Sequence, residues 1–223
     1  MLSEIFLLLD VLAFIHFNNK RLSYKDVNEF ELKLGYKDNL IYKKPLVVNM
    51  KKTPHLLVCG LSGQGKSKMV EYSLKDKNVI LINSFEEDFK SLKCRRIIGN
   101  ENILIFFKML LNDLFERSSN STPLYIAIDE LLILCIDKNI TKCIQDLLAI
   151  GRHYNIFIIG ISQVGTKESI KFKDLFNCRV CFRNVEESSY RAVLGSTVPN
   201  TKLYNQQFYL YSDNIYFGET YTF

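Results

Sequence analysis

The sequence has no hydrophobic run long enough to cross a membrane. Residues 5–17 are apolar except for Asp10 and His16. These 13 residues would span only about 20 Å as a helix, against a hydrocarbon core of about 30 Å. No basic segment precedes the stretch and no small-residue cleavage site follows it, so we expect no signal peptide. We expect a cytoplasmic protein in which residues 5–17 pack as a helix on the core or on a neighbouring subunit. The alternative is attachment of this helix to a membrane surface.

The sequence also lacks the cysteine spacing of a zinc site. Cys178 and Cys181 form a C-x-x-C pair, but no second pair stands at ligand spacing. Without a secretory leader, the six cysteines indicate reduced thiols.

Neither a strong charge excess nor an internal repeat is present. The net charge of +5 permits a polyanionic partner but does not require one. With 48% hydrophobic and 24% charged residues, the chain is typical of a globular protein. We expect an N-terminal helical segment, residues 1–33, and one main domain, residues 34–223.

The segment Gly60-Leu-Ser-Gly-Gln-Gly-Lys-Ser67 matches the phosphate-loop pattern G-x-x-x-x-G-K-S and directly follows an apolar, strand-like run. In such a loop the backbone N–H groups and the start of the next helix converge on phosphate oxygens. Lys66 would reach the β- and γ-phosphates, and the Ser67 hydroxyl would hold Mg²⁺. The motif therefore predicts binding of ATP and Mg²⁺. The residues expected to contact the nucleotide are Gly60, Ser62, Gly63, Gln64, Gly65, Lys66, Ser67 and Lys68.

Apolar runs alternate with helical patterns after this loop. Expected strands cover residues 78–83, 124–128, 156–162 and 178–183, and expected helices cover residues 66–74, 102–117, 141–152 and 186–194. This alternation predicts an α/β fold of the RecA-like P-loop type, with a mainly parallel sheet between helices and a ligand at the carboxyl ends of the strands. We expect two hairpins as well. One, with a turn at Lys43-Lys44, leads into the loop strand, and the other, residues 207–217, closes the sheet edge.

Polar residues end two of the expected strands. Asp129 follows one strand, where a carboxylate associated with Mg²⁺ belongs, and Glu130 beside it can polarise an attacking water. Gln163 ends the next strand, within reach of a γ-phosphate. Each could instead be an ordinary solvated residue. Arg152 precedes the strand that Gln163 ends, so it is either a surface arginine or a group that acts on a neighbouring subunit.

Three segments resemble the FtsK/HerA superfamily of DNA-pumping ATPases. They are Pro54-His-Leu-Leu-Val-Cys-Gly60, Ile-Asp129-Glu130, and the stretch from Gly151-Arg152 to Ser-Gln163. Arg179 and Arg191 also resemble positions of that superfamily, and the similarity covers residues 34–223. Within the superfamily the chain resembles FtsK/SpoIIIE motors, conjugation coupling proteins and viral packaging ATPases.

The resemblance implies a role for each site residue. Lys66 and Ser67 would bind phosphate and Mg²⁺, Asp129 the metal, and Glu130 the water. Gln163 would sense the γ-phosphate, and Arg152 would act in trans within a homo-oligomer, expected to be a hexamer.

The expected function is a DNA translocase of a mobile element or virus. Genome packaging, conjugative transfer and filamentous-phage assembly are the alternatives, with a relaxase, a capsid or a membrane component as further partner. A nucleotide-switched scaffold that does not move DNA is the alternative of a different class.

Two basic clusters could track DNA phosphates along a ring's pore without reading bases. One is Lys167, Lys171 and Lys173, and the other is Lys90, Lys93, Arg95 and Arg96. Either could instead be a solvated surface.

Overall fold

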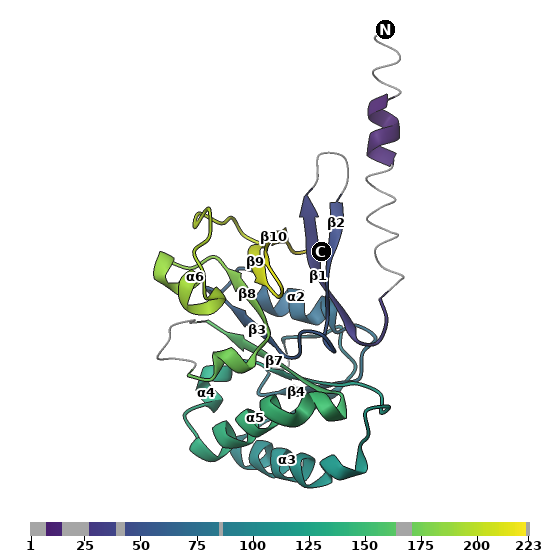
Figure 1. Cartoon of the computed structure of the whole chain (residues 1–223), viewed down its shortest axis with the longest axis vertical. Helices are drawn as coiled ribbons and strands as arrows, with labels where there is room; N and C mark the ends of the chain where they lie inside the picture. Colours follow the sequence, from purple (N-terminus) through teal and green to yellow (C-terminus); the bar gives the residue numbers. More distant parts are fainter. Residues whose placement is uncertain (1–7, 15–26, 39–42, 85–86, 164–170, 222–223) are drawn as a thin grey trace.

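Ten strands form one mixed sheet in the computed structural model of the chain (Figure 1). The structure describes residues 8–14, 27–38, 43–84, 87–163 and 171–221. The strand order is β2-β1-β10-β9-β8-β3-β7-β6-β4-β5. The six strands from β8 to β5 run parallel, and the four from β2 to β9 pair antiparallel.

The strands are β1 (Glu31–Asp38), β2 (Lys43–Asn49), β3 (Leu56–Cys59), β4 (Val79–Ile82), β5 (Arg95–Ile97), β6 (Leu124–Ile128), β7 (Ile156–Ser162), β8 (Cys178–Phe182), β9 (Gln207–Tyr211) and β10 (Ile215–Glu219). Besides a helix of residues 8–14, the described α-helices are α2 (Lys66–Ser73), α3 (Asn100–Asn112), α4 (Leu131–Leu134), α5 (Lys138–Ile150) and α6 (Glu187–Leu194). Three single 3₁₀ turns are η1 (Asp113–Glu116), η2 (Gly151–Tyr154) and η3 (Lys173–Leu175).

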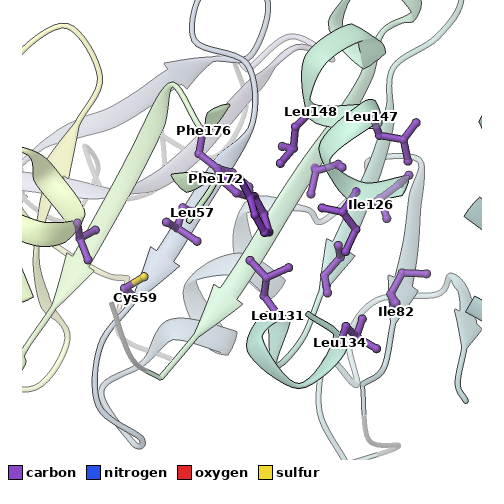
Figure 2. Packing of buried hydrophobic residues seen from close by; sticks show 14 of the residues in the cluster. Leu57, Cys59, Ile82, Ile126, Leu131, Leu134, Leu147, Leu148, Phe172 and Phe176 are labelled. Atoms are coloured by element: carbon purple, nitrogen blue, oxygen red, sulfur yellow. The ribbon is translucent and has the colours of Figure 1, made fainter. Parts of the chain in front are cut away.

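The central strands are apolar because helices and loops cover them on both faces. Every residue of β3, β6 and β7 is buried, as expected for parallel strands inside an α/β sheet. On one face, α3, α4 and α5 pack over a core that includes Leu57, Ile126 and Leu147 (Figure 2). On the other face, α2 and the hairpin β1–β2 enclose a second core that includes Val58 and Phe157. Because elements pack on both faces of the sheet, the carboxyl ends of the parallel strands are held next to one another at one end of the sheet.

The structure confirms the predicted fold class and the α/β alternation, including the strand over residues 156–162. Two predictions about hairpins were wrong in detail. Lys43 and Lys44 begin β2 instead of forming a turn, because the first strand starts earlier, at Glu31. The hairpin β9–β10 does not close the sheet edge. It lies between β8 and β1, and the edges are β2 and β5.

The N-terminal part behaves differently from the core. Residues 8–14 form a helix whose apolar side chains, among them Leu8 and Phe14, are exposed, so the expected packing on the core of the same chain is not seen there. No helix within the described residues is long and apolar enough to cross a membrane. Strand β1 starts three residues before the expected boundary at residue 34. The apolar spacing of the helix expected over residues 102–117 predicts that Phe115 lies on its buried face, but Phe115 is 86% exposed in η1.

Candidate nucleotide-binding site

The phosphate loop connects β3 to the first turn of α2. Gly63 and Gly65 have positive φ angles of 74° and 100°, which glycine adopts without steric penalty. A Cβ at Gly63 would meet nothing within 4 Å, whereas a Cβ at Gly60 would lie 2.6 Å from Cβ of Phe182 in β8. Gly63 therefore leaves open space beside the loop, and Gly60 is required by the close approach of a neighbouring strand.

The side chain of Lys66 is held inside the loop. Its ammonium donates a hydrogen bond to the carbonyl of Leu61, 2.8 Å away. Burial lowers the pKa of Lys66, and the nearby Glu130, Cys59 and Asp129 oppose that shift. Because the Lys66 ammonium is partly removed from water, it can bind phosphate oxygens strongly.

A cavity of about 340 Å³ opens in front of the loop. It brings together most of the residues that the sequence singled out, from the loop and from the ends of β6 and β7. The lining residues are Ser62, Gly63, Gly65, Lys66, Ser67, Lys68, Asp88, Asp129, Glu130, Ile161 and Gln163. Gly60 and Gln64 are not among them; the Gln64 carbonyl accepts a hydrogen bond from the backbone of Gln206.

Asp129 is a buried carboxyl at the end of β6. Burial raises its pKa to about 6, with further increases from the nearby carboxylates of Asp88 and Glu130, while Lys66 acts in the opposite direction. Three acids thus share one cavity. Sequence reasoning missed Asp88, which follows β4 by six residues in an acidic stretch and could have been found only by placing that loop over the edge of the sheet.

Glu130 and Gln163 come from adjacent strands and contact each other. The side-chain amide of Gln163 donates a hydrogen bond to the Glu130 carboxylate. Glu130 has a positive φ of 52°, a conformation that non-glycine residues adopt rarely and often at functional sites. The pair places a carboxylate and an amide together at the cavity, where they could orient a water molecule.

No protein-family model and no curated protein matches the chain. Solved structures do. The pCW3 conjugation coupling protein TcpA, solved with ATPγS, aligns over 89% of this chain and 68% of its own, with a TM-score of 0.76 and 16% identity. The type VII secretion ATPase EccC of Thermomonospora curvata aligns over 87% of this chain but only 29% of its own, with a TM-score of 0.71 and 16% identity.

A viral protein also matches. The genome packaging NTPase B204 of Sulfolobus turreted icosahedral virus 2, solved with ATPγS, aligns over 76% of this chain and 98% of its own, with a TM-score of 0.55 and 14% identity. At 14–16% identity, these likenesses concern the fold of the chain. This chain has a RecA-like P-loop ATPase fold.

In this RecA-like fold, Arg152 lies far from the cavity. It is an exposed residue of η2, which precedes the amino end of β7, whereas Gln163 follows the carboxyl end of the same strand. The structure therefore does not bring Arg152 together with the other predicted site residues of its own chain.

The two basic clusters differ in environment. Lys171 is exposed, Lys173 is largely buried and pairs with Asp174, and Lys167 lies outside the described residues. In the second cluster, Arg96 is engaged by Ser84 and by the carbonyls of Asp88 and Phe89. Arg96 thus holds the loop that carries Asp88 and is not available as a pore contact.

The donor set at the cavity fits a magnesium ion bound together with a nucleotide. Ser67 begins α2 and Asp129 faces the same cavity, and Mg²⁺ typically takes one or two protein ligands with phosphates and waters. The carboxylates of Asp88 and Glu130 raise the pKa of Asp129, and a divalent cation would stabilise such a group of neighbouring acids. Among the described residues, no group of three or more His, Cys, Asp or Glu side chains is arranged as a closed metal site.

Proposed function

We propose that this protein hydrolyses ATP with Mg²⁺ and, assembled as a ring, uses hydrolysis to move DNA of any sequence through a central pore. The observation that supports the proposal most directly is the arrangement in one cavity of the loop ammonium of Lys66, the buried carboxyl of Asp129 and the hydrogen-bonded pair Glu130 and Gln163.

Each residue has a distinct task in this proposal. Lys66 exchanges its bond to the Leu61 carbonyl for bonds to the β- and γ-phosphates. The Ser67 hydroxyl and the Asp129 carboxylate hold Mg²⁺, which when bound neutralises phosphate charge. Glu130 accepts a proton from the attacking water, and Gln163 orients the Glu130 carboxylate and reports the presence of the γ-phosphate.

We propose that ATP hydrolysis is coupled to DNA through the segment that follows the carboxyl end of β7. Lys171 is exposed and follows Gln163, the residue after β7, by eight positions in the sequence. We propose that residues 34–223 form the motor, that Lys167, Lys171 and Lys173 include phosphate contacts to DNA, and that the N-terminal residues 1–33 serve assembly or attachment. A relaxase, a capsid or a membrane component would then supply the biological context.

The decisive experiment compares ATP turnover with and without DNA. Sequence-independent stimulation is expected, together with DNA binding that weakens steeply as salt rises, because phosphates dominate the contact. Lys66→Ala should abolish turnover, since it removes the charge that stabilises the transferring phosphoryl group, and Lys171→Ala should reduce stimulation but spare basal turnover. An ATP turnover rate that no nucleic acid changes would favour a nucleotide-switched scaffold.

Genome packaging is a second candidate within the same class. The similarity to B204 spans 98% of that packaging NTPase, so this chain includes the counterpart of nearly the whole viral enzyme. Packaging predicts stimulation by double-stranded DNA above single-stranded DNA, and transfer of a single strand predicts the reverse order.

A further inference from the structure

Helix α3 is apolar on two faces, only one of which is covered by the core. Ile103 and Phe107 are fully buried against the sheet. On the other side, Ile105 and Met109 follow each other at helical spacing and are 57% and 58% exposed. These two side chains form an exposed apolar strip on the outer face of α3, which also carries exposed polar residues such as Lys108. Large apolar side chains exposed next to each other often mark a contact surface.

This outer face is hollowed. A groove of about 480 Å³ runs between α3 and β5, the edge strand of the sheet. Phe106 and Leu110 line it as partly buried residues, and Ile98, which follows β5, is 52% exposed. Arg95 contributes an exposed cation, while Asp113 provides an acid beside the end of α3. We call this the edge groove.

The same chain exposes a second apolar surface, the helix formed by residues 8–14. Leu8, Leu9, Val11 and Phe14 are between 47% and 68% exposed, and in Figure 1 this helix stands away from the sheet. Its single charged residue is Asp10. The helix therefore offers apolar side chains of a size suited to a hydrophobic groove and one acid that complements Arg95.

We propose that the helix of residues 8–14 binds in the edge groove of a second copy of this chain. Both surfaces are exposed at once in a single chain, which is the situation expected when each is covered only on assembly. Residues 15–26, which separate the helix from the body, can span at most about 40 Å when extended, enough to reach an adjacent copy. The contact is heterologous, since one chain supplies the helix and the next supplies the groove, and such contacts build rings or filaments.

This contact rests on the assembly part of the proposed function but not on ATP hydrolysis. The charge of the helix favours a protein groove over a membrane surface as its binding partner, because its charged residue, Asp10, is acidic. The helix of residues 8–14 carries no lysine or arginine, and basic residues are what anionic lipids attract.

Cross-linking between full-length chains tests the proposal. In a Cys94→Ser/Cys135→Ser background, which removes the two partly exposed native thiols, chains carrying Val11→Cys are mixed with chains carrying Met109→Cys and treated with a short bismaleimide. We expect a cross-linked dimer containing one chain of each kind. Phe115→Cys is the matched control, because Phe115 is exposed at the end of the same helical segment but does not line the groove. The Met109→Cys mixture should give several-fold more dimer than the control.

A second measurement does not depend on introduced thiols. Met109→Glu should shift the mass measured by light scattering to smaller species, whereas Phe115→Glu should leave it unchanged. Equal effects of the two glutamates would overturn the proposal. A Val11→Cys/Met109→Cys double variant that cross-links only within single chains would also overturn it. So would absence of the dimer, whether or not the protein floats with phospholipid vesicles. Repeating the cross-linking with Lys66→Ala chains separates the contact from catalysis, because the dimer should form whether or not ATP is hydrolysed.

Discussion

At the residue scale, Glu130 is the group on which hydrolysis depends in the proposed mechanism. Its carboxylate accepts a hydrogen bond from Gln163, and its backbone is held in a left-handed conformation at the end of β6. Both features fix the direction of the carboxylate before a substrate arrives, which is the form of preorganisation that general base catalysis requires.

Glu130→Gln is expected to lower turnover by about 10²-fold or more, because the amide keeps the shape of the side chain but cannot accept the proton. Nucleotide affinity, measured by titration with a fluorescent ATP analogue, should stay within a few fold of the wild type. Glu101→Gln changes an exposed acid in the first turn of α3 and should have no effect. Normal turnover in Glu130→Gln would mean that another group activates the water.

His55 provides a prediction about stability and pH. It is buried, its Nδ1 accepts a hydrogen bond from the backbone N–H of Ile158, and burial lowers its pKa to about 4. Below its usual pKa of about 6.5, the unfolded chain binds a proton that the folded chain excludes. The contribution of His55 to the free energy of unfolding is therefore fully present above pH 6.5. It is lost as the pH falls toward 4, and the total loss is about 3 kcal/mol.

The matched variant is His55→Asn. Asparagine tolerates the positive φ of this position, 64°, and its side-chain oxygen can accept the Ile158 N–H, but it does not titrate. Denaturant unfolding at pH 7 and pH 4.5 should show a larger loss of stability in the wild type than in the variant. Equal losses would show that His55 is protonated in the folded state without penalty.

At the element scale, the sequence predicted what depends on local pattern and missed what depends on neighbours. Strand β7 was found at its true bounds because a run of six residues without a polar side chain, residues 156–161, ends at the polar pair Ser162 and Gln163. Strand β5 was missed because Arg95–Ile97 has one apolar residue in three and is defined only by its pairing with β4. The site followed the same rule. Asp129, Glu130 and Gln163 end apolar strands, whereas Asp88 stands in a loop that Arg96 holds over the cavity.

The phosphate loop gives a prediction at this scale, because its glycines serve different purposes. Gly60→Ala would place a Cβ 2.6 Å from Phe182 in β8, so the two strands must separate, at a cost of about 1–3 kcal/mol from overpacking. Gly63→Ala would meet no atom within 4 Å and should cost about 1–2 kcal/mol through its left-handed backbone alone.

Thermal unfolding should therefore show a lower Tm for Gly60→Ala than for Gly63→Ala. Gly63→Ala should weaken nucleotide binding more than Gly60→Ala does, although it is the more stable variant. Gly63 lines the cavity, so its added methyl group lies beside the nucleotide site, whereas Gly60 does not line the cavity. A Gly60→Ala protein as stable as the wild type would show that β8 can move away from the loop freely.

At the scale of the whole molecule, the two ends of the sheet have complementary features. The carboxyl end of the parallel strands carries three acids in one cavity, Asp88, Asp129 and Glu130. The amino end of β7 follows η2, which carries the exposed Arg152 and His153. No arginine lines the described part of the cavity.

The arrangement within one chain excludes Arg152 from its own cavity. The seven residues of β7 separate Arg152 from Gln163 by roughly 20 Å at about 3.3 Å per residue. An arginine supplied by a neighbouring subunit can raise turnover by about 10³-fold or more, by stabilising charge on the transferring phosphoryl group. We therefore expect Arg152→Ala to be nearly inactive while it still binds nucleotide.

Mixing two inactive variants tests the trans arrangement. Arg152→Ala chains keep an intact phosphate loop, and Lys66→Ala chains keep an intact Arg152. In a mixed ring some interfaces pair the two intact halves, so part of the turnover should return, with a maximum at an intermediate mixing ratio. Mixed assembly is checked separately by pulling down one tagged variant with the other. If mixed rings form and no ratio restores hydrolysis, Arg152 acts within its own chain or only stabilises the turn before β7.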